Sequence, residues 1–207
     1  MTLEADQVCN ALRRAFANVR ADAATETWTH AGLRALAELG EAGGMRVDPP
    51  RWSDTGRDEG KAGEFLWDLT LSDWPRSTTK TYEFPGYFAA AARSGARLCL
   101  VAESEWGKET APGATGLEVM EDFAKLLAAR SELKVMIFGY QSKTKASFEK
   151  LSDLMTKLSG VSGDPATYVL YGLDWKTTGS CHLVVRDGRP GTLVQHTYGK
   201  SVAKKRA

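Results

Sequence analysis

Two carboxylates follow directly on an apolar stretch in the segment LCLVAESEWGK, residues 98–108. Side chains of an extended chain alternate between two faces, so Glu103 and Glu105 are expected to share one face with Cys99 and Val101. The apolar residues on both faces predict an interior strand of a sheet that helices cover on both sides. Two neighbouring carboxylates at its end repel each other unless a metal ion, a basic side chain or water compensates them. The pair therefore marks either a cation site or the solvent-exposed end of the strand.

A third carboxylate, Asp68, lies within the apolar segment EFLWDLTL, residues 64–71. A lone carboxylate in such a strand is unfavourable unless it is paired, coordinated or solvated. Successive strands are often neighbours in a sheet, which would bring Asp68 and Glu103 together at one end. Mg²⁺ prefers hard oxygen ligands of this kind, and it activates water and stabilises the charge that builds on a phosphodiester. A twisted, exposed strand end is the alternative explanation of Asp68.

The chain contains, in order, an acid in a helix, Asp68 in a strand, a strand ending in Glu-x-Glu, a helix and a further strand. This order resembles the PD-(D/E)XK restriction-endonuclease-like superfamily over residues 29–172. The resemblance implies a three-layer α/β fold with a mixed central sheet between helices. It also implies hydrolysis of nucleic-acid phosphodiester bonds with Mg²⁺, for which Mn²⁺ can substitute. Asp68 and Glu103 would ligate the metal, and Glu38 or Glu41 would complete the cluster, unless these two are ordinary surface acids of an amphipathic helix.

The chain departs from the family pattern at Glu105, where the family usually has lysine. A lysine there orients the attacking water and offsets developing charge, whereas a glutamate acts as a base or as a further metal ligand. Some relatives supply the lysine from the following helix, which makes Lys125 of EDFAKLL a candidate catalytic residue, and Lys108 is another candidate. The helical wheel opposes Lys125, because it lies opposite the apolar face and four residues after Glu121, a spacing typical of a solvent-exposed ion pair.

The rest of the sequence predicts the elements that position these residues. Helical periodicity predicts helices over 5–21, 29–42, 116–130 and 145–160, the second with Thr29 as its N-cap, and a short helix over 87–95. Apolar runs predict strands over 64–71, 97–105, 134–140, 167–175 and 180–188, and the hydrophilic segment 47–64 predicts a loop. This order predicts one α/β domain over residues 1–200 and a basic, disordered tail over 201–207.

The composition narrows the class of protein. Hydrophobic residues make up 43% and charged residues 26% of the chain, which are values of a globular domain. Three widely spaced cysteines offer neither a disulfide framework nor a zinc knuckle, and they suit a reducing compartment. The sequence contains no apolar stretch of the roughly 18 residues that a membrane helix needs, and its beginning does not resemble a signal peptide. We therefore expect a cytoplasmic protein without a membrane partner.

Basic side chains in the polar segments are candidate contacts to nucleic-acid phosphates. They are Arg51, Lys61, Lys80 and Lys143, the last at the start of a helix whose N-terminus favours phosphate. The formal net charge of +1 excludes a broad polycationic surface but allows a local basic groove beside an acidic site. Phosphate contacts supply affinity without sequence specificity, and in most proteins such residues are ordinary surface positions. We expect DNA rather than RNA as the nucleic acid, with a homodimer as one open arrangement.

Three functions fit these observations. The first is a Mg²⁺-dependent nuclease. The second is a catalytically inactive domain of the same fold that acts as a binding or assembly subunit, which Glu105 in place of lysine and the near-neutral charge favour. The third is an unrelated α/β interaction protein with surface acids. The histidines lack a zinc-binding spacing, and the sequence contains neither a GxSxG segment nor a GxxxxGK[ST] segment. Convergence of Asp68, Glu103 and Glu105 in space would distinguish the first function from the third.

Overall fold

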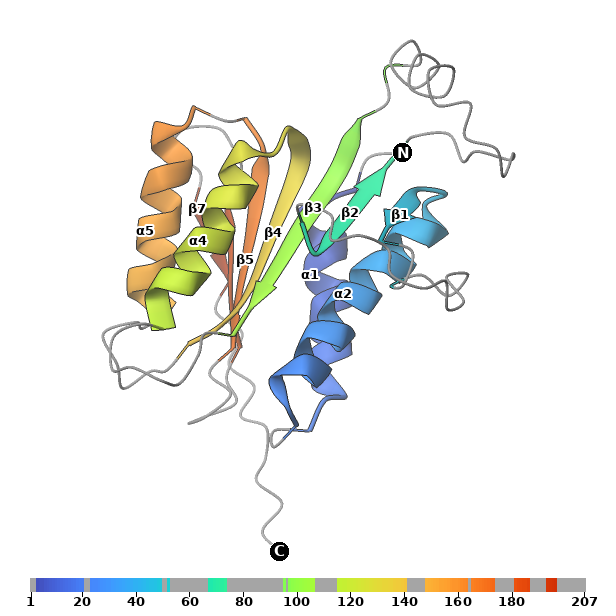
Figure 1. The fold of residues 1–207 in the computed structure, drawn as a ribbon, viewed down its shortest axis with the longest axis horizontal. Coiled ribbons are helices and arrows are strands. Elements are labelled where there is room, and N and C mark those ends of the chain that lie inside the picture. The colour runs from blue at the N-terminus through green and yellow to red at the C-terminus, as the bar shows by residue number, and fades with distance from the viewer. Residues whose placement is uncertain are drawn as a thin grey trace, which may run out of the picture.

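Within the described residues, a seven-stranded mixed sheet in the order β1 to β7 organises the chain (Figure 1). The strands are β1 (Arg46–Asp48), β2 (Leu69–Ser72), β3 (Leu98–Glu105), β4 (Ser131–Gly139), β5 (Thr167–Leu173), β6 (Cys181–Arg186) and β7 (Leu193–His196). β1 to β3 are antiparallel, β3 to β5 are parallel, and β5 to β7 are antiparallel. This computed structural model describes residues 3–20, 23–49, 52, 67–73, 95, 97–106, 115–140, 148–163, 165–173, 181–186 and 193–196.

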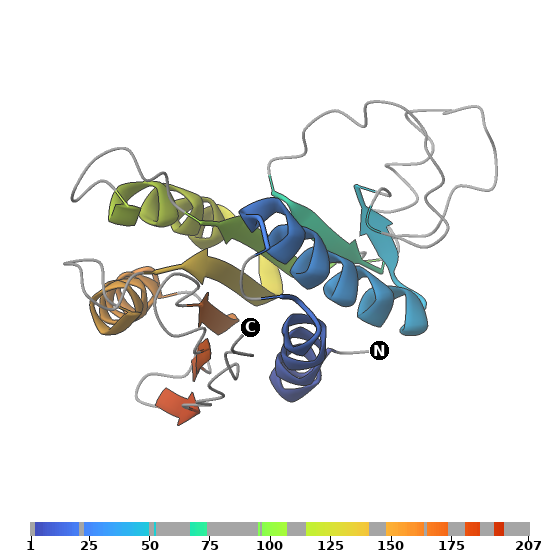
Figure 2. The same cartoon turned by 90° about the horizontal axis from the view of Figure 1, so that it is seen from below.

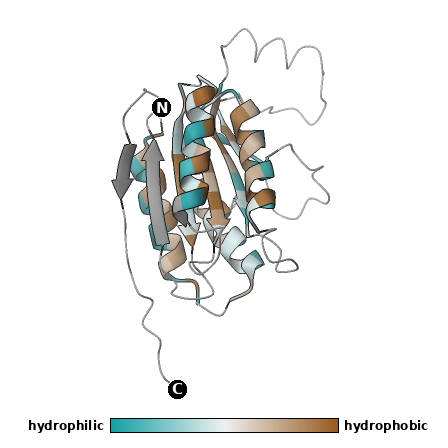
Figure 3. Ribbon diagram, turned by 90° about the vertical axis from the view of Figure 1, so that its left-hand side faces the viewer, coloured by the Kyte–Doolittle hydropathy of each residue, from teal (hydrophilic) through white to brown (hydrophobic). Residues whose placement is uncertain are grey.

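Two pairs of helices pack against the two faces of the sheet. They are α1 (Ala5–Ala17) and α2 (Thr25–Ala42) on one face, and α4 (Thr115–Ala128) and α5 (Phe148–Val161) on the other. The two pairs lie apart from each other in both views of the ribbon (Figures 1 and 2). The helices carry hydrophobic and hydrophilic residues in alternating patches (Figure 3), as amphipathic helices on a sheet do. The predicted three-layer α/β architecture with a mixed central sheet is confirmed.

The central strand β3 sends side chains into both cores. Leu100 packs against the face that α1 and α2 cover, whereas Val101 packs against the face that α4 and α5 cover. β3 has one residue more than β2 between Leu98 and Leu100, so Cys99 forms a β-bulge. The bulge places Cys99 in the same core as Leu100. The expectation that Cys99 shares a face with Glu103 is therefore wrong, because the regular alternation begins only after the bulge.

The predicted helices and the five predicted strands are present, with shifted boundaries. α2 begins four residues earlier than expected, with Ala24 as its N-cap, so Thr29 lies inside the helix and the N-cap assignment is wrong. The strand predicted over 64–71 begins only at Leu69, and Asp68 lies in a bend directly before it. Residues 87–94 of the short helix predicted over 87–95, and the tail over 201–207, lie outside the described residues.

Two strands were not predicted. β7 contains four residues, and β1 lies at the edge of a segment predicted as a loop. The chain reaches β1 through a helix end at which Gly44 adopts a left-handed φ of 71°. The N–H of Gly44 donates to the carbonyl of Glu41, and the N–H of Met45 donates to the carbonyl of Gly40. This Schellman-type end turns the chain sharply from α2 into the sheet. Among the described residues, no helix has the length and apolar composition that crossing a membrane requires.

The closest approach of α2 to the sheet supplies a test of this packing. A Cβ added at Gly40 would lie 2.6 Å from Cδ2 of Leu71. We expect Gly40→Val to lower the free energy of unfolding by about 1–3 kcal/mol, because the added atoms overpack the interface between α2 and β2. Ala42→Val, two residues later at an exposed position, should lower it by only a few tenths of a kcal/mol through helix propensity. Urea denaturation of both variants measures the difference, and equal losses would contradict this packing.

Candidate active site

Glu103 is a buried carboxylate near the end of the central strand. Its side chain is 2% exposed, and Oε2 lies 3.8 Å from Nζ of Lys125 in α4. The other oxygen, Oε1, is buried and has no hydrogen-bond partner among the described residues. β3 lies between β2 and β4, and α4 packs on this face, so Glu103 is enclosed although the last two residues of the strand are partly exposed. The alternative of a solvent-exposed strand end therefore does not describe Glu103.

Asp68 reaches the same place through the antiparallel pairing of β2 and β3. Leu69 pairs with Ala102, so the start of β2 meets the end of β3. The backbone N–H of Ser104 donates a 2.9 Å hydrogen bond to Oδ2 of Asp68. On the backbone side, the indole N–H of Trp52 donates to the carbonyl of Asp68 at 2.9 Å. Two hydrogen bonds therefore fix Asp68 beside the strand that carries Glu103.

The electrostatics of Glu103 reflect its enclosure. Burial, and next to it the negative charge of Asp68, raise the pKa of Glu103 to about 9. The ammonium of Lys125 acts in the opposite direction, while Asp122 and Glu105 add smaller upward contributions. Without a bound cation, Glu103 therefore holds a proton at neutral pH. Such a proton occupies a place that a metal ion can take, because a cation stabilises the ionised carboxylate.

Glu105 contributes to the same electrostatic environment. It lies two residues after Glu103 at the end of β3, where its side chain is partly buried. Its negative charge acts on Glu103, and the alternation of side chains along the strand places both acids on one face. Asp68, Glu105 and Lys125 therefore all act electrostatically on Glu103.

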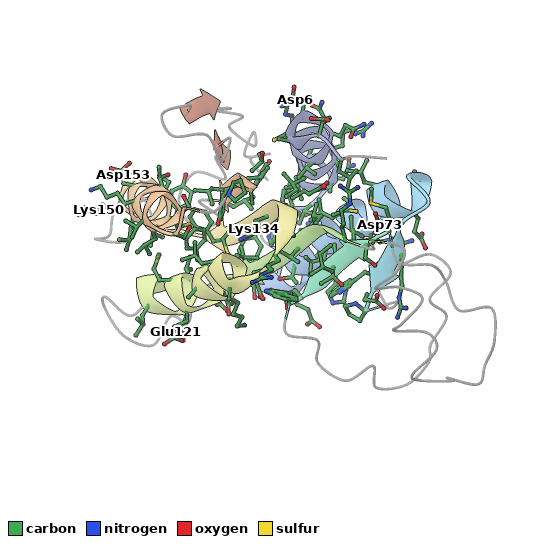
Figure 4. All side chains as sticks on the ribbon, turned by 90° about the horizontal axis from the view of Figure 1, so that it is seen from above. Asp6, Asp73, Glu121, Lys134, Lys150 and Asp153 are labelled. Carbon is green, nitrogen blue, oxygen red and sulfur yellow. The ribbon has the colours of Figure 1, made fainter. Side chains whose placement is uncertain are left out.

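Lys125 departs from its expected surroundings. Its Nζ lies 2.6 Å from Oδ1 of Asp122, one helical turn earlier, and this hydrogen bond raises the pKa of Lys125. Glu121, the partner expected from the spacing of four residues, lies on the outer side of α4 (Figure 4). The helical wheel argued against a place for Lys125 in the site because it describes only the direction of the Cα to Cβ bond. A four-carbon side chain can turn its ammonium back toward the sheet. Asp122 was not predicted, although a spacing of three residues is as favourable as four.

Glu38 does not join this cluster. It is exposed on α2, which covers the opposite face of the sheet, and its Oε1 accepts a 2.9 Å hydrogen bond from Nε of Arg34. Neither Glu38 nor Glu41 is among the charges that shift the pKa of Glu103. The position of Glu38 therefore does not support its assignment as a metal ligand. The assignment was made because the sequence pattern does not show which face of the sheet α2 covers. Lys108 and the candidate phosphate contacts Arg51, Lys61, Lys80 and Lys143 lie outside the described residues.

A network of polar side chains joins the end of β3 to α2. The indole N–H of Trp106 donates to Oγ1 of Thr29 at 2.6 Å, and this hydroxyl lies 3.2 Å from Oγ of Ser104. Ser104 therefore contacts α2 through its side chain and Asp68 through its backbone N–H. No local sequence pattern indicates this link, because its contacts join residues 75 and 77 positions apart.

The carboxylates present are suited to a hard divalent cation with an open coordination sphere. Within the part of the chain that the structure describes, no three His, Cys, Asp or Glu side chains form a ready metal cage. Mg²⁺ does not require one, since it is commonly held by one or two carboxylates while water and substrate phosphate fill the other positions. The buried, unpartnered Oε1 of Glu103 and the nearby Asp68 fit this mode of binding.

The raised pKa of Glu103 predicts an unusual dependence of stability on pH. Between the ordinary pKa of 4.5 and the folded value of about 9, the folded state binds more protons at this group than the unfolded state. Its contribution to stability is therefore complete below pH 4.5 and is lost as the pH rises, by about 1.4 kcal/mol per pH unit. Glu103→Gln removes this titration. Relative to wild type in EDTA, the variant should become progressively more stable between pH 5 and pH 8.

Urea denaturation at several pH values measures this difference. Glu38→Gln is the matched control, because Glu38 is exposed and lies on the other side of the sheet. Its stability relative to wild type should change little with pH. Parallel pH profiles for wild type and Glu103→Gln would show that Glu103 is not protonated in the folded protein.

Comparison with known proteins identifies no relative of this chain. No family model, no curated protein and no solved structure matches it. The function of the chain must therefore be argued from the cluster around Glu103 and from the order of elements that positions it.

Proposed function

We propose that this protein is a metal-dependent nuclease that hydrolyses phosphodiester bonds in nucleic acid, with DNA as the preferred substrate. The proposal rests on the buried Glu103, whose Oε1 has no hydrogen-bond partner among the described residues. The charges of Asp68 and Lys125 act on the same carboxyl group. An acidic pair beside a lysine is the set of side chains that a metal-dependent phosphodiesterase needs. The order of α2, Asp68, β3 with its Glu-x-Glu, α4 and β4 also agrees with the order expected from the resemblance to the PD-(D/E)XK superfamily.

Each residue of the cluster has a role in this proposal. Asp68 and Glu103 would hold Mg²⁺, or Mn²⁺ in its place, and Glu103 would release its proton on binding. The bound ion supplies a more acidic water and neutralises charge on the phosphate. Glu105, the more exposed of the two β3 acids, would accept a proton from the attacking water. Lys125 would offset the negative charge that develops on the phosphate oxygens, the role for which the family usually uses a lysine on the strand.

The charge balance of the cluster supports a cationic cofactor. Among the described residues, four carboxylates, those of Asp68, Glu103, Glu105 and Asp122, act together with the ammonium of Lys125. If all are ionised, the cluster has a net charge of −3, which follows from four negative charges and one positive charge. A phosphodiester would be repelled by this charge unless a divalent cation intervened. Metal binding is therefore expected to precede or accompany nucleic-acid binding.

Metal binding is the first test of this proposal. We expect calorimetry to show binding of Mn²⁺ and Mg²⁺ to the wild type, and at least a tenfold weaker binding to Asp68→Asn and to Glu103→Gln, because each loses an anionic ligand. Glu38→Gln should bind metal as the wild type does. Circular dichroism confirms that every variant is folded. If metal binds equally to all four proteins, the ion does not occupy this cluster.

Cleavage is the second test. With Mg²⁺ or Mn²⁺, we expect the wild type to cleave single- or double-stranded DNA and Lys125→Met to lose at least about 100-fold in kcat while it retains metal binding, because it lacks a charge-stabilising group. Lys150→Met, on the exposed surface of α5, is the control. RNA is assayed in parallel to determine the substrate class. Metal binding without cleavage of any nucleic acid would favour the alternative of a catalytically inactive binding or assembly domain.

A further inference from the structure

Lys125 is held at both its side chain and its backbone. Its ammonium lies 2.6 Å from Oδ1 of Asp122 and 3.8 Å from Oε2 of Glu103. Its backbone carbonyl accepts a 3.2 Å hydrogen bond from the indole N–H of Trp67. The first contact is a short, charge-assisted hydrogen bond, whereas the second exceeds hydrogen-bond length. Asp122 is therefore the group that determines where the ammonium lies.

We propose that Asp122 is a positioning residue that holds the ammonium of Lys125 beside Glu103. The geometry of α4 supports this assignment, because residues three positions apart lie on the same side of a helix. Asp122 is also well shielded, with 17% of its side chain exposed, whereas the side chain of Lys125 is 41% exposed. A half-exposed lysine with a flexible side chain would otherwise adopt many rotamers in solvent. A role of Asp122 in cleavage rests on the proposed function, whereas its role in holding the ammonium of Lys125 does not.

Trp67 fixes the helix that carries both residues. The last four carbonyls of an α-helix lack intrahelical partners, and the carbonyl of Lys125 is one of them because α4 ends at Ala128. The indole of Trp67 supplies the missing donor and also packs in the core beneath α4 and α5. Trp67 directly precedes Asp68 in the chain. This hydrogen bond therefore links α4 to the residue next to Asp68, directly before β2.

A weaker role for Asp122 is the alternative. Pairs of opposite charge on an exposed helix surface contribute little and leave the lysine mobile. If the pair between Asp122 and Lys125 were of that kind, its loss would alter neither the order of the Lys125 side chain nor its relation to Glu103. The two roles therefore differ in a property that can be measured without metal, substrate or activity.

The experiment measures the mobility of the Lys125 side chain by NMR relaxation in the metal-free protein. Lysine is labelled with ¹³C at the ε carbon, and Lys125→Met identifies the signal. In the wild type, we expect a markedly higher order parameter for Lys125 than for Lys150, which is exposed on α5. In Asp122→Asn, the order parameter of Lys125 should fall to the value of Lys150. In Glu121→Gln, the adjacent surface control, it should stay at the wild-type value.

Two further readouts separate positioning from a structural role. Asp122→Glu restores a carboxylate and should recover most of the lost order, whereas thermal denaturation shows whether Asp122→Asn remains folded. If the wild type cleaves DNA, Asp122→Asn should lower kcat about 10- to 100-fold with little change in KM or metal affinity, since a displaced catalytic group costs about that much.

The outcomes distinguish the two proposals. Loss of Lys125 order in folded Asp122→Asn supports the positioning role even if the wild type cleaves nothing, in which case only the proposed function fails. A Lys125 side chain that is equally ordered in wild type and Asp122→Asn overturns the positioning role, as does one that is as mobile in wild type as Lys150. If Asp122→Asn does not fold, two other comparisons of order parameters decide between these outcomes. They are Lys125 against Lys150 in the wild type, and Lys125 in the wild type against Lys125 in Asp122→Glu.

Discussion

The burial of one carboxyl group, that of Glu103, constrains the whole site. A carboxylate in an apolar environment is unfavourable unless another charge or a proton compensates it. The sheet encloses Glu103 because β3 lies between an antiparallel neighbour and a parallel one, with α4 packed above. In this enclosure, the charged groups of the described residues that act on it come from Asp68 directly before β2, from α4 and from Glu105 at the end of β3. Burial thus turns ordinary acidic and basic residues into an interdependent set whose protonation states are linked.

The two layers of helices contribute differently to this set. α4 carries Lys125 and Asp122 directly into the site. α2 contributes no charge to it, yet its Thr29 forms polar contacts with the end of β3. Ser104 transmits this contact, because its hydroxyl lies beside Thr29 while its backbone N–H donates to Asp68. The position of a carboxylate on one face of the sheet therefore depends partly on a helix that packs against the other face.

The sequence predicted what is encoded locally. β3 and the importance of Glu103 followed from charges placed in an apolar run, which is a strong local signal because burial of charge is costly. β1 was missed because its three residues, Arg46, Val47 and Asp48, are too few to form an apolar run and two of them are charged. Glu38 was placed in the cluster because a helix pattern does not show which face of a sheet the helix will cover. The partner of Lys125 was misassigned because its position depends on side-chain reach and on the packing of α4, neither of which a helical wheel describes.

The unusual residue at the end of β3 can be understood together with α4. A lysine at position 105 would bring a positive charge next to Glu103 from the strand itself. In this chain Glu105 adds a negative charge there, and the ammonium comes instead from Lys125 on the helix. With Glu105 at this position, the cluster is more acidic than it would be with a lysine there. Its ammonium is carried by a long side chain on a helix rather than by the central strand. An ammonium on such a side chain needs its own anchor, and Asp122, one helical turn away and largely shielded from solvent, is positioned to provide it.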